Sequence, residues 1–158
     1  MKRFINISCL IVLLFFSRQS YAQDSQKEIW STLLYDVTIK YRYSIEYNAF
    51  MPKIKFGDKL KAMDGKKITL HGFYLPTDLT GMIFILSYAP SKMCFFCSGA
   101  GIESIVELNP KEEEKKKFEK LKTDNYFEVT GKLRLNADDN NHLIYILDDA
   151  EFIKIIQK

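Results

Sequence analysis

The sequence predicts a mainly β domain, a five-stranded barrel with one helix between strands 3 and 4 and an added helix and strand at the N-terminal side. Three observations lead to this prediction. Short runs rich in apolar residues recur along the second half of the chain, and turn residues separate them. One segment with helix-capping signals interrupts the series after the third run.

Five runs predict the strands of the barrel. Pro76 ends the first run, and a polar stretch of Asn, Ala and Asp separates the last two. The second run is almost entirely apolar, which favours a strand buried on both faces. The expected strands cover residues 68–75, 82–88, 103–108, 126–135 and 143–147, and the last can resume through Phe152 and Ile153.

The helix is expected to begin at Asn109-Pro110. Asn109 is a suitable cap, Pro110 fits the first helical position, and Glu112 can complete a capping box. Acidic residues precede lysines in this segment, which suits the helix dipole. We interpret the charge run as a solvated helix face rather than a binding patch.

An N-terminal extension precedes the barrel. Apolar spacings of three and four predict a short amphipathic helix over 24–34, and alternation predicts a half-buried strand over 37–47. Several aromatic residues could form a platform on which nucleic-acid bases stack. Alternating aromatic residues in strands are more typical of a core, so we expect core positions for them. These residues are Tyr41, Tyr43, Tyr47, Phe73, Tyr74, Phe95 and Phe96.

The order strand, strand, strand, helix, strand, strand is that of the OB-fold, a five-stranded barrel that binds ligands on one face and through the loops after its first and fourth strands. An open α+β sheet with the same elements is the alternative. The expected organisation is a signal peptide over 1–22, the extension over 23–65 and the OB-like barrel over 66–158.

Residues 1–22 have the features of a cleavable secretory signal. An apolar run over 7–16 is too short to span a membrane, and Ser20 and Ala22 are small residues suited to cleavage before Gln23. An uncleaved anchor is the alternative. The expected location is periplasmic, and the mature chain has no second membrane segment.

Charge argues against a nucleic-acid partner. The chain has 23 Lys and Arg against 20 Asp and Glu. Three of the cations, Lys2, Arg3 and Arg18, lie in the expected signal, so the mature balance is 20 against 20. A nucleic-acid-binding protein needs a positive excess that this mature chain lacks.

The densest chemistry lies at Cys94 and Cys97. The pair can form a structural disulfide, exchange disulfides, or supply half of a metal site. Histidine with thiolates suits zinc, and methionine with thiolates suits copper. The possible additional ligands are His71, Met93, Glu103 and His142, and the surrounding residues that would tune the sulfurs are Phe95, Phe96, Gly99 and Gly101.

The redox interpretation needs a helix directly after the cysteines. Gly99 and Gly101 weaken such a helix, and a strand-like run follows at once. The sequence also contains no Ser-His-Asp order, phosphate-binding loop or paired-carboxylate motif to complete an active site.

The chain resembles an uncharacterised exported bacterial family, a domain of unknown function with a Cys-Phe-Phe-Cys-Gly-Gly-Ala-Gly-Pro-Glu motif. The matching stretches are residues 60–68, 72–76, 94–104, 131–133 and 145–150. Ser98 and Ile102 depart from the motif, whereas both cysteines are kept. The resemblance implies an exported OB-like domain, a metal or thiol role for the cysteines, and an ABC-type membrane transport complex as a partner.

These observations together predict an exported periplasmic accessory or binding protein, rather than a conventional enzyme, that handles a soft metal ion through Cys94 and Cys97. Two alternatives stay open. One is a thiol-disulfide oxidoreductase, and the other is an interaction domain of a membrane complex with a structural disulfide.

Overall fold

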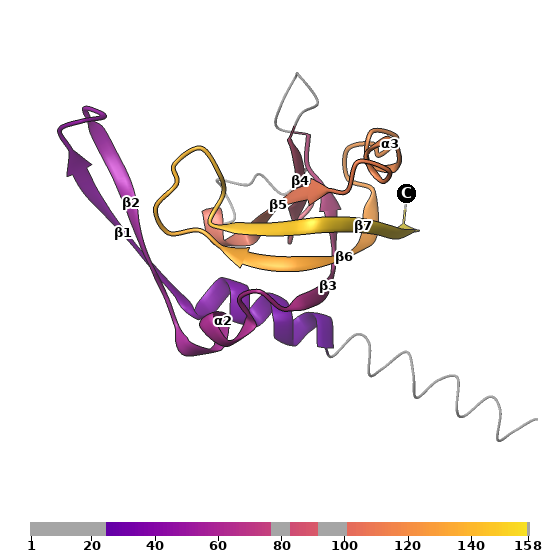
Figure 1. Cartoon of the computed structure of the whole chain (residues 1–158), viewed down its shortest axis with the longest axis horizontal. Helices are drawn as coiled ribbons and strands as arrows, with labels where there is room; N and C mark the ends of the chain where they lie inside the picture. The colour runs from indigo at the N-terminus through magenta and orange to yellow at the C-terminus, as the bar shows by residue number, and fades with distance from the viewer. Residues whose placement is uncertain (1–24, 77–82, 92–100, 158) are drawn as a thin grey trace, which may run out of the picture.

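The computed structural model describes residues 25–76, 83–91 and 101–157. The protein is mainly β, as predicted, with a five-stranded mixed sheet and a separate two-stranded hairpin that projects from it (Figure 1). The five strands are β3 (Lys67–Tyr74), β4 (Phe84–Ser87), β5 (Ile105–Pro110), β6 (Tyr126–Leu135) and β7 (Tyr145–Gln157).

The five strands pair in a closed ring with the order β3-β4-β5-β7-β6. The ring closes because β3 pairs with both β4 and β6. Four of the pairings are antiparallel, and β5 with β7 is parallel. β6 has the bounds expected from the sequence, whereas β7 is a single long strand that begins at Tyr145, two residues later than expected, and continues past the expected end at residue 147 to Gln157.

The expected start of the helix at Asn109-Pro110 is wrong. Both residues belong to β5, whose parallel ladder with β7 continues through them with a register shift. The side-chain amide of Asn109 donates to Asp148 Oδ1 at 3.1 Å instead of capping a helix. The segment between β5 and β6 forms turns and one short helix, α3 (Lys115–Phe118), which begins without a side-chain cap.

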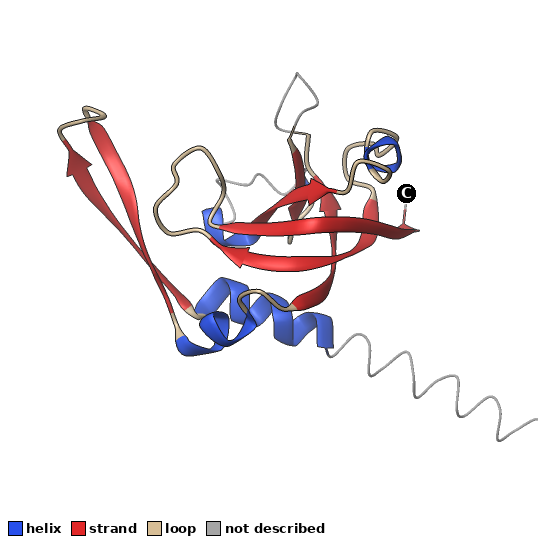
Figure 2. Ribbon diagram, viewed as in Figure 1, coloured by secondary structure: helices blue, strands red, loops and turns tan. Residues whose placement is uncertain are grey.

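The core fills the ring and continues under the N-terminal helix, residues 25–35, and α2 (Asp58–Met63). Figure 2 shows these helices together along one side of the sheet. Trp30, Leu33 and Leu60 are buried in the same cluster as the barrel strands. The Tyr145 hydroxyl donates to the Leu33 carbonyl at 2.7 Å, so the helix is fixed to the barrel by a buried hydrogen bond.

Two glycines mark where barrel strands approach closely. A Cβ at Gly72 would lie 2.7 Å from the Ser87 carbonyl oxygen, and one at Gly131 would lie 2.8 Å from that of Asp148. Because these contacts are to backbone, a side chain there requires the strands to separate.

The hairpin consists of β1 (Val37–Ser44), a turn over 45–48 and β2 (Ala49–Phe56), and is called the arm below. β1 confirms the strand expected in this region, but β2 was not expected. The prediction that Tyr41, Tyr43 and Tyr47 belong to the core is wrong, because all three are exposed. Only the base of the arm, at residues such as Val37 and Phe56, packs against the core.

Candidate functional site

The site expected from the sequence centres on a segment that the structure does not describe. Residues 92–100 lie outside the described ranges, and they include Cys94, Cys97, Met93, Phe95, Phe96 and Gly99. The redox state and coordination of the cysteines therefore stay predictions. The described residues on both sides of this segment show where it leaves the barrel and returns to it.

The described residues that flank this segment, Ser91 and Gly101, make hydrogen bonds to side chains. The backbone N–H and the hydroxyl of Ser91 donate to the two carboxylate oxygens of Asp124, at 2.7 and 2.8 Å. On the other side, the Gly101 N–H donates to Glu103 Oε1 at 3.1 Å, and the Ser104 hydroxyl donates to the Gly101 carbonyl at 2.8 Å. A Cβ at Gly101 would lie 2.4 Å from Glu103 Oε2, so a larger residue there would displace the Glu103 carboxylate.

His71, a proposed additional ligand, lies on β3 beside Glu128. Its Nε2 is 3.6 Å from Glu128 Oε2, and its ring is perpendicular to that of Tyr126, with centroids 6.3 Å apart. Burial lowers the pKa of His71, although the Glu128 carboxylate opposes this effect. The His71 carbonyl accepts a hydrogen bond from the Trp30 indole at 2.8 Å, which ties this part of β3 to the N-terminal helix.

His142 lies elsewhere, in the loop between β6 and β7. Its Nδ1 is 2.7 Å from Glu107 Oε1, and Glu107 Oε2 accepts the Leu143 N–H at 3.0 Å. The two histidines thus contact different carboxylates on different strands. Across 25–76, 83–91 and 101–157, no group of three or more His, Cys, Asp or Glu side chains is placed to hold a metal ion.

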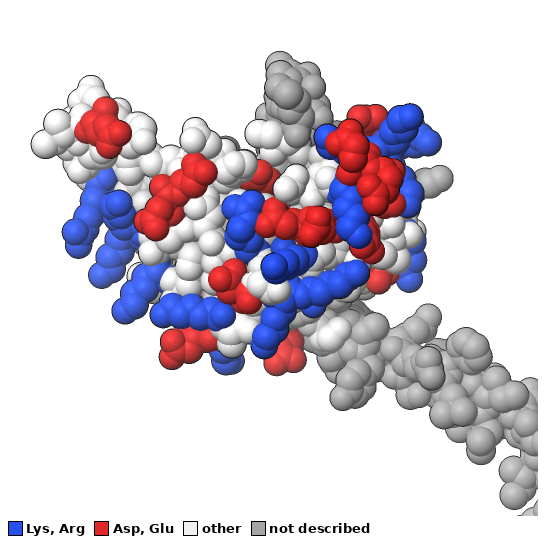
Figure 3. Space-filling model, in the orientation of Figure 1, with Lys and Arg blue, Asp and Glu red and all other residues white. Residues whose placement is uncertain are grey.

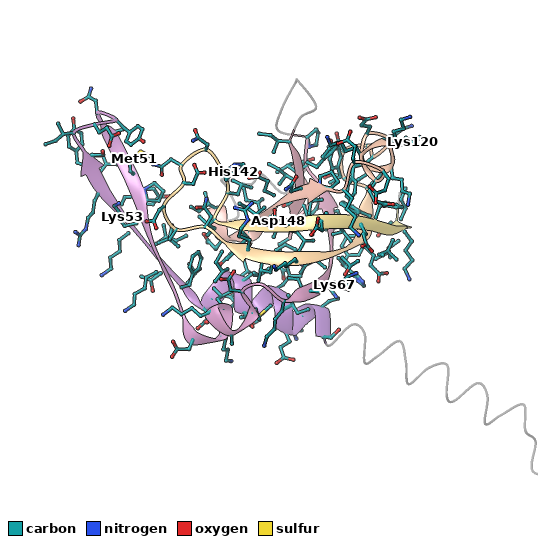
Figure 4. All side chains as sticks on the ribbon, viewed as in Figure 1. Met51, Lys53, Lys67, Lys120, His142 and Asp148 are labelled. Carbon is teal, nitrogen blue, oxygen red and sulfur yellow. The ribbon has the colours of Figure 1, made fainter. Side chains whose placement is uncertain are left out.

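A different candidate site lies between the arm and the loop over residues 136–144. Two adjoining cavities of about 200 and 450 Å³ occupy this space. Met51, Pro52, Ala137 and Asn140 line both of them, and we call the combined space the groove. Figure 4 shows Met51 and Lys53 on the arm and His142 on the loop beside it.

The smaller cavity combines an apolar wall with a polar rim. The arm contributes Pro52 and Ile54, the short turn before β5 contributes Ile102, and the end of the loop contributes Ile144. The loop contributes amide and carboxylate groups, including Asp139. The larger cavity is more polar and carries both signs of charge, from Arg42, Lys53, Glu46 and Asp138. Such a lining suits a ligand that has both an apolar and a polar part.

Asn136 organises the loop side of the groove. Its side-chain amide donates to the carbonyls of Asp139, His142 and Leu143 at 2.7, 3.3 and 3.1 Å, and its Oδ1 accepts the Asp139 N–H at 2.9 Å. A hydrogen bond from the Asn141 N–H is the main cause that lowers the pKa of Asp139. One residue therefore holds the turns of this loop in a single arrangement.

Sequence reasoning missed the groove because it missed β2. Phe50, Pro52, Ile54 and Phe56 alternate with Met51, Lys53 and Lys55, which is the period of a strand. Pro52 obscured the pattern, since proline lacks the N–H that a central strand needs. In the arm it is tolerated because the ribbon has only two strands.

Comparison with known proteins places the chain in no family. No family model matches it, and neither a curated protein nor a solved structure is significantly similar to it. The resemblance based on the cysteine motif stays a prediction. None of the helices in the described ranges is long and apolar enough to cross a membrane.

Proposed function

We propose that this chain is an exported accessory protein that binds a partner through the groove and is not an enzyme. Its scaffold would be an OB-fold. Support for this assignment comes from the ring order β3-β4-β5-β7-β6, the parallel pairing of the third strand with the fifth, and the position of α3 after the third strand. Binding in OB-folds involves the loop after the fourth strand, which here is the 136–144 loop.

The observation that carries this proposal is the groove itself. A loop held by Asn136 faces the base of the arm, which is anchored in the core at Phe56, so these two parts of the lining are in place before a ligand arrives. A preformed site loses less conformational entropy on binding than a mobile one. A peptide segment with one apolar side chain for the smaller cavity fits this lining, and the expected partner is an ABC-type membrane transport complex.

Site-specific photocrosslinking in intact cells tests this function. A photoreactive amino acid replaces Asn140, which lines both cavities, and a matched protein carries it at Lys120, at the opposite end of the molecule (Figure 4). We expect a protein adduct from position 140 only. Ala137→Phe, which fills the groove from the loop side, should abolish the adduct. An adduct that survives Ala137→Phe, or equal adducts from both positions, would contradict the proposal.

A soft-metal role for Cys94 and Cys97 is the second candidate. It rests on the spacing of the two thiols and on the resemblance, with zinc or copper as the expected ion. Native mass spectrometry of protein purified without reductant or chelator is the test. A metal mass that is lost in Cys94→Ser/Cys97→Ser supports this role, whereas a mass two hydrogens below the reduced value, without metal, supports a disulfide or an oxidoreductase.

The same spectrum tests the proposed export. A mass equal to that of a chain beginning at Gln23 supports cleavage of residues 1–22 and a periplasmic location. A mass that includes Met1 would contradict cleavage.

A further inference from the structure

The outer half of the arm carries an unusual density of exposed apolar side chains. Tyr41, Tyr43, Ile45, Tyr47 and Phe50 are 60, 55, 90, 53 and 69% exposed. All five lie toward the end of the arm that is away from the barrel (Figure 1). A concentrated exposed apolar patch of this kind marks an interaction surface.

The strand register gives the arm two faces of different chemistry. Residues directly opposite in an antiparallel pair point to the same side. Tyr43 pairs with Phe50 and Tyr41 with Pro52, so one face is apolar from the core to the tip. The other face carries the cations of the arm, Lys40, Arg42, Lys53 and Lys55.

The cationic face is unbalanced. Lys40 and Lys53 are directly opposite each other, an arrangement that destabilises a strand pair. No ion pair within the described part of the chain involves any of the four cations. Figure 3 shows their positive charge along one side of the arm. The arm has four cations against one acid, Glu46, a net charge of +3 that favours an anionic partner.

The edges of the arm are poorly suited to pairing with another strand. Pro52 cannot donate a hydrogen bond, and lysines on both strands oppose edge-to-edge association. A partner is therefore contacted through side chains at the tip and along the cationic face, not by strand addition.

We propose that the tip of the arm docks on an anionic phospholipid membrane. Ile45 and Tyr47, in the turn, would enter the interface first, with Tyr43 and Phe50 behind them. Arg42 and then Lys40 and Lys53 follow along the arm, at the depth of the lipid phosphates. This order matches the preference of aromatic side chains for the membrane interface and of Lys and Arg for anionic headgroups.

This surface is less suited to nucleic acid. Ile45, the most exposed apolar residue of the tip, has no ring on which a base can stack. The docking surface adjoins the groove, because Tyr43, Tyr47, Arg42 and Lys53 also line the larger cavity. Ile45 lines neither cavity, so a variant at Ile45 tests membrane docking apart from the groove.

Vesicle co-sedimentation tests membrane docking. The protein as purified from cells, with the same N-terminus in every variant, is mixed with neutral phosphatidylcholine vesicles and with vesicles containing phosphatidylglycerol. We expect binding to the anionic vesicles only. Ile45→Ser/Tyr47→Ser should abolish it, and Lys40→Gln/Lys53→Gln should weaken it by about 30-fold, since each cation near an anionic surface contributes about fivefold.

Two control variants distinguish binding through the arm from a general effect of lost positive charge or of a lost exposed aromatic side chain. Lys116→Gln/Lys120→Gln removes the same charge from exposed positions in and just after α3, and Tyr35→Ser removes an exposed tyrosine outside the arm. Both should bind as the wild type does. Glu46→Gln should strengthen binding, because it removes the acid at the tip.

Three results would overturn the proposal. They are equal binding to neutral and anionic vesicles, loss of binding in the control variants to the same extent as in the arm variants, and no vesicle binding together with arm-dependent binding of a single-stranded oligonucleotide. Each variant is compared by its unfolding temperature first, and Ile45→Asn alone replaces the double tip variant if that one is destabilised.

Discussion

The barrel and the arm have the same sequence period but opposite burial. In β6, alternate residues such as Phe127, Val129 and Leu133 are fully buried, because the ring gives one side of each strand a common interior. In β1, alternate residues are equally apolar, yet Tyr41 and Tyr43 face solvent. The difference teaches that alternation predicts a strand with an apolar face and does not specify what covers that face.

The largest expected effect comes from truncating the same side-chain type in the two regions. Phe127→Ala removes a buried ring that contacts Phe118 and Phe152, and should lower the free energy of unfolding by about 3–5 kcal/mol. Phe50→Ala removes an exposed ring whose described ring partner is Tyr43, and should cost less than about 1 kcal/mol. Urea unfolding measures both, and comparable losses would contradict the distinction between barrel and arm.

A smaller effect should come from the close approach of barrel strands. Gly131→Ala places a Cβ 2.7 Å from Leu147 Cγ and 2.8 Å from the Asp148 carbonyl oxygen. We expect a loss of about 1–3 kcal/mol, because backbone must move to admit the methyl group. Urea unfolding again provides the value. Wild-type stability in this variant would show that the ring is looser than described.

The stability of the 136–144 loop should depend on the side chain of Asn136 and not on that of Asn140. Asn136→Ala removes the hydrogen bonds to Asp139, His142 and Leu143, and should cost about 1–2 kcal/mol and speed amide exchange in the loop. Asn140→Ala is the matched control, since Asn140 is exposed in the same loop. Equal exchange rates in the two variants would contradict the role of Asn136.

The smallest effect concerns pH. Since burial lowers the pKa of His71 below 6.5 in the folded state, the unfolded chain binds more protons once the pH falls below that value. Stability is therefore full above pH 6.5 and declines as the pH falls toward the folded pKa. Because His71 is partly exposed, we expect less than about 1 kcal/mol between pH 7.5 and 5.5. His71→Gln should reduce this decline, and an unchanged decline would assign it to other groups.

The barrel strands could be predicted from the sequence because each one is short, apolar on at least one face and bounded by turn residues. β6 has the expected bounds, Tyr126–Leu135. The end of β5 could not be predicted, because Asn109 and Pro110 are residues typical of a helix start, whereas in the structure they pair in parallel with β7. Local capping signals describe the chain alone, whereas the neighbouring strand decides whether they are used.

The candidate site was harder to predict from the sequence than the barrel. The groove depends on β2 and on the 136–144 loop, which are about 80 residues apart in the chain. The sequence shows this loop only as a polar stretch, and the hydrogen bonds of Asn136 that shape it cannot be deduced from composition. The predicted ligands His71 and His142 do not share a site, since His71 contacts Glu128 and His142 contacts Glu107.

Hydrogen exchange, followed with and without phosphatidylglycerol vesicles, tests most directly the claim that a stable barrel carries an exposed arm for docking. In solution, amides of β6 and β7 should exchange only through global unfolding, whereas those at residues 41–51 should exchange far faster, because an isolated two-stranded ribbon is marginally stable. Vesicles should slow exchange in the arm and leave the barrel unchanged. Equal protection of arm and barrel in solution, or an arm unaffected by vesicles, would contradict the account.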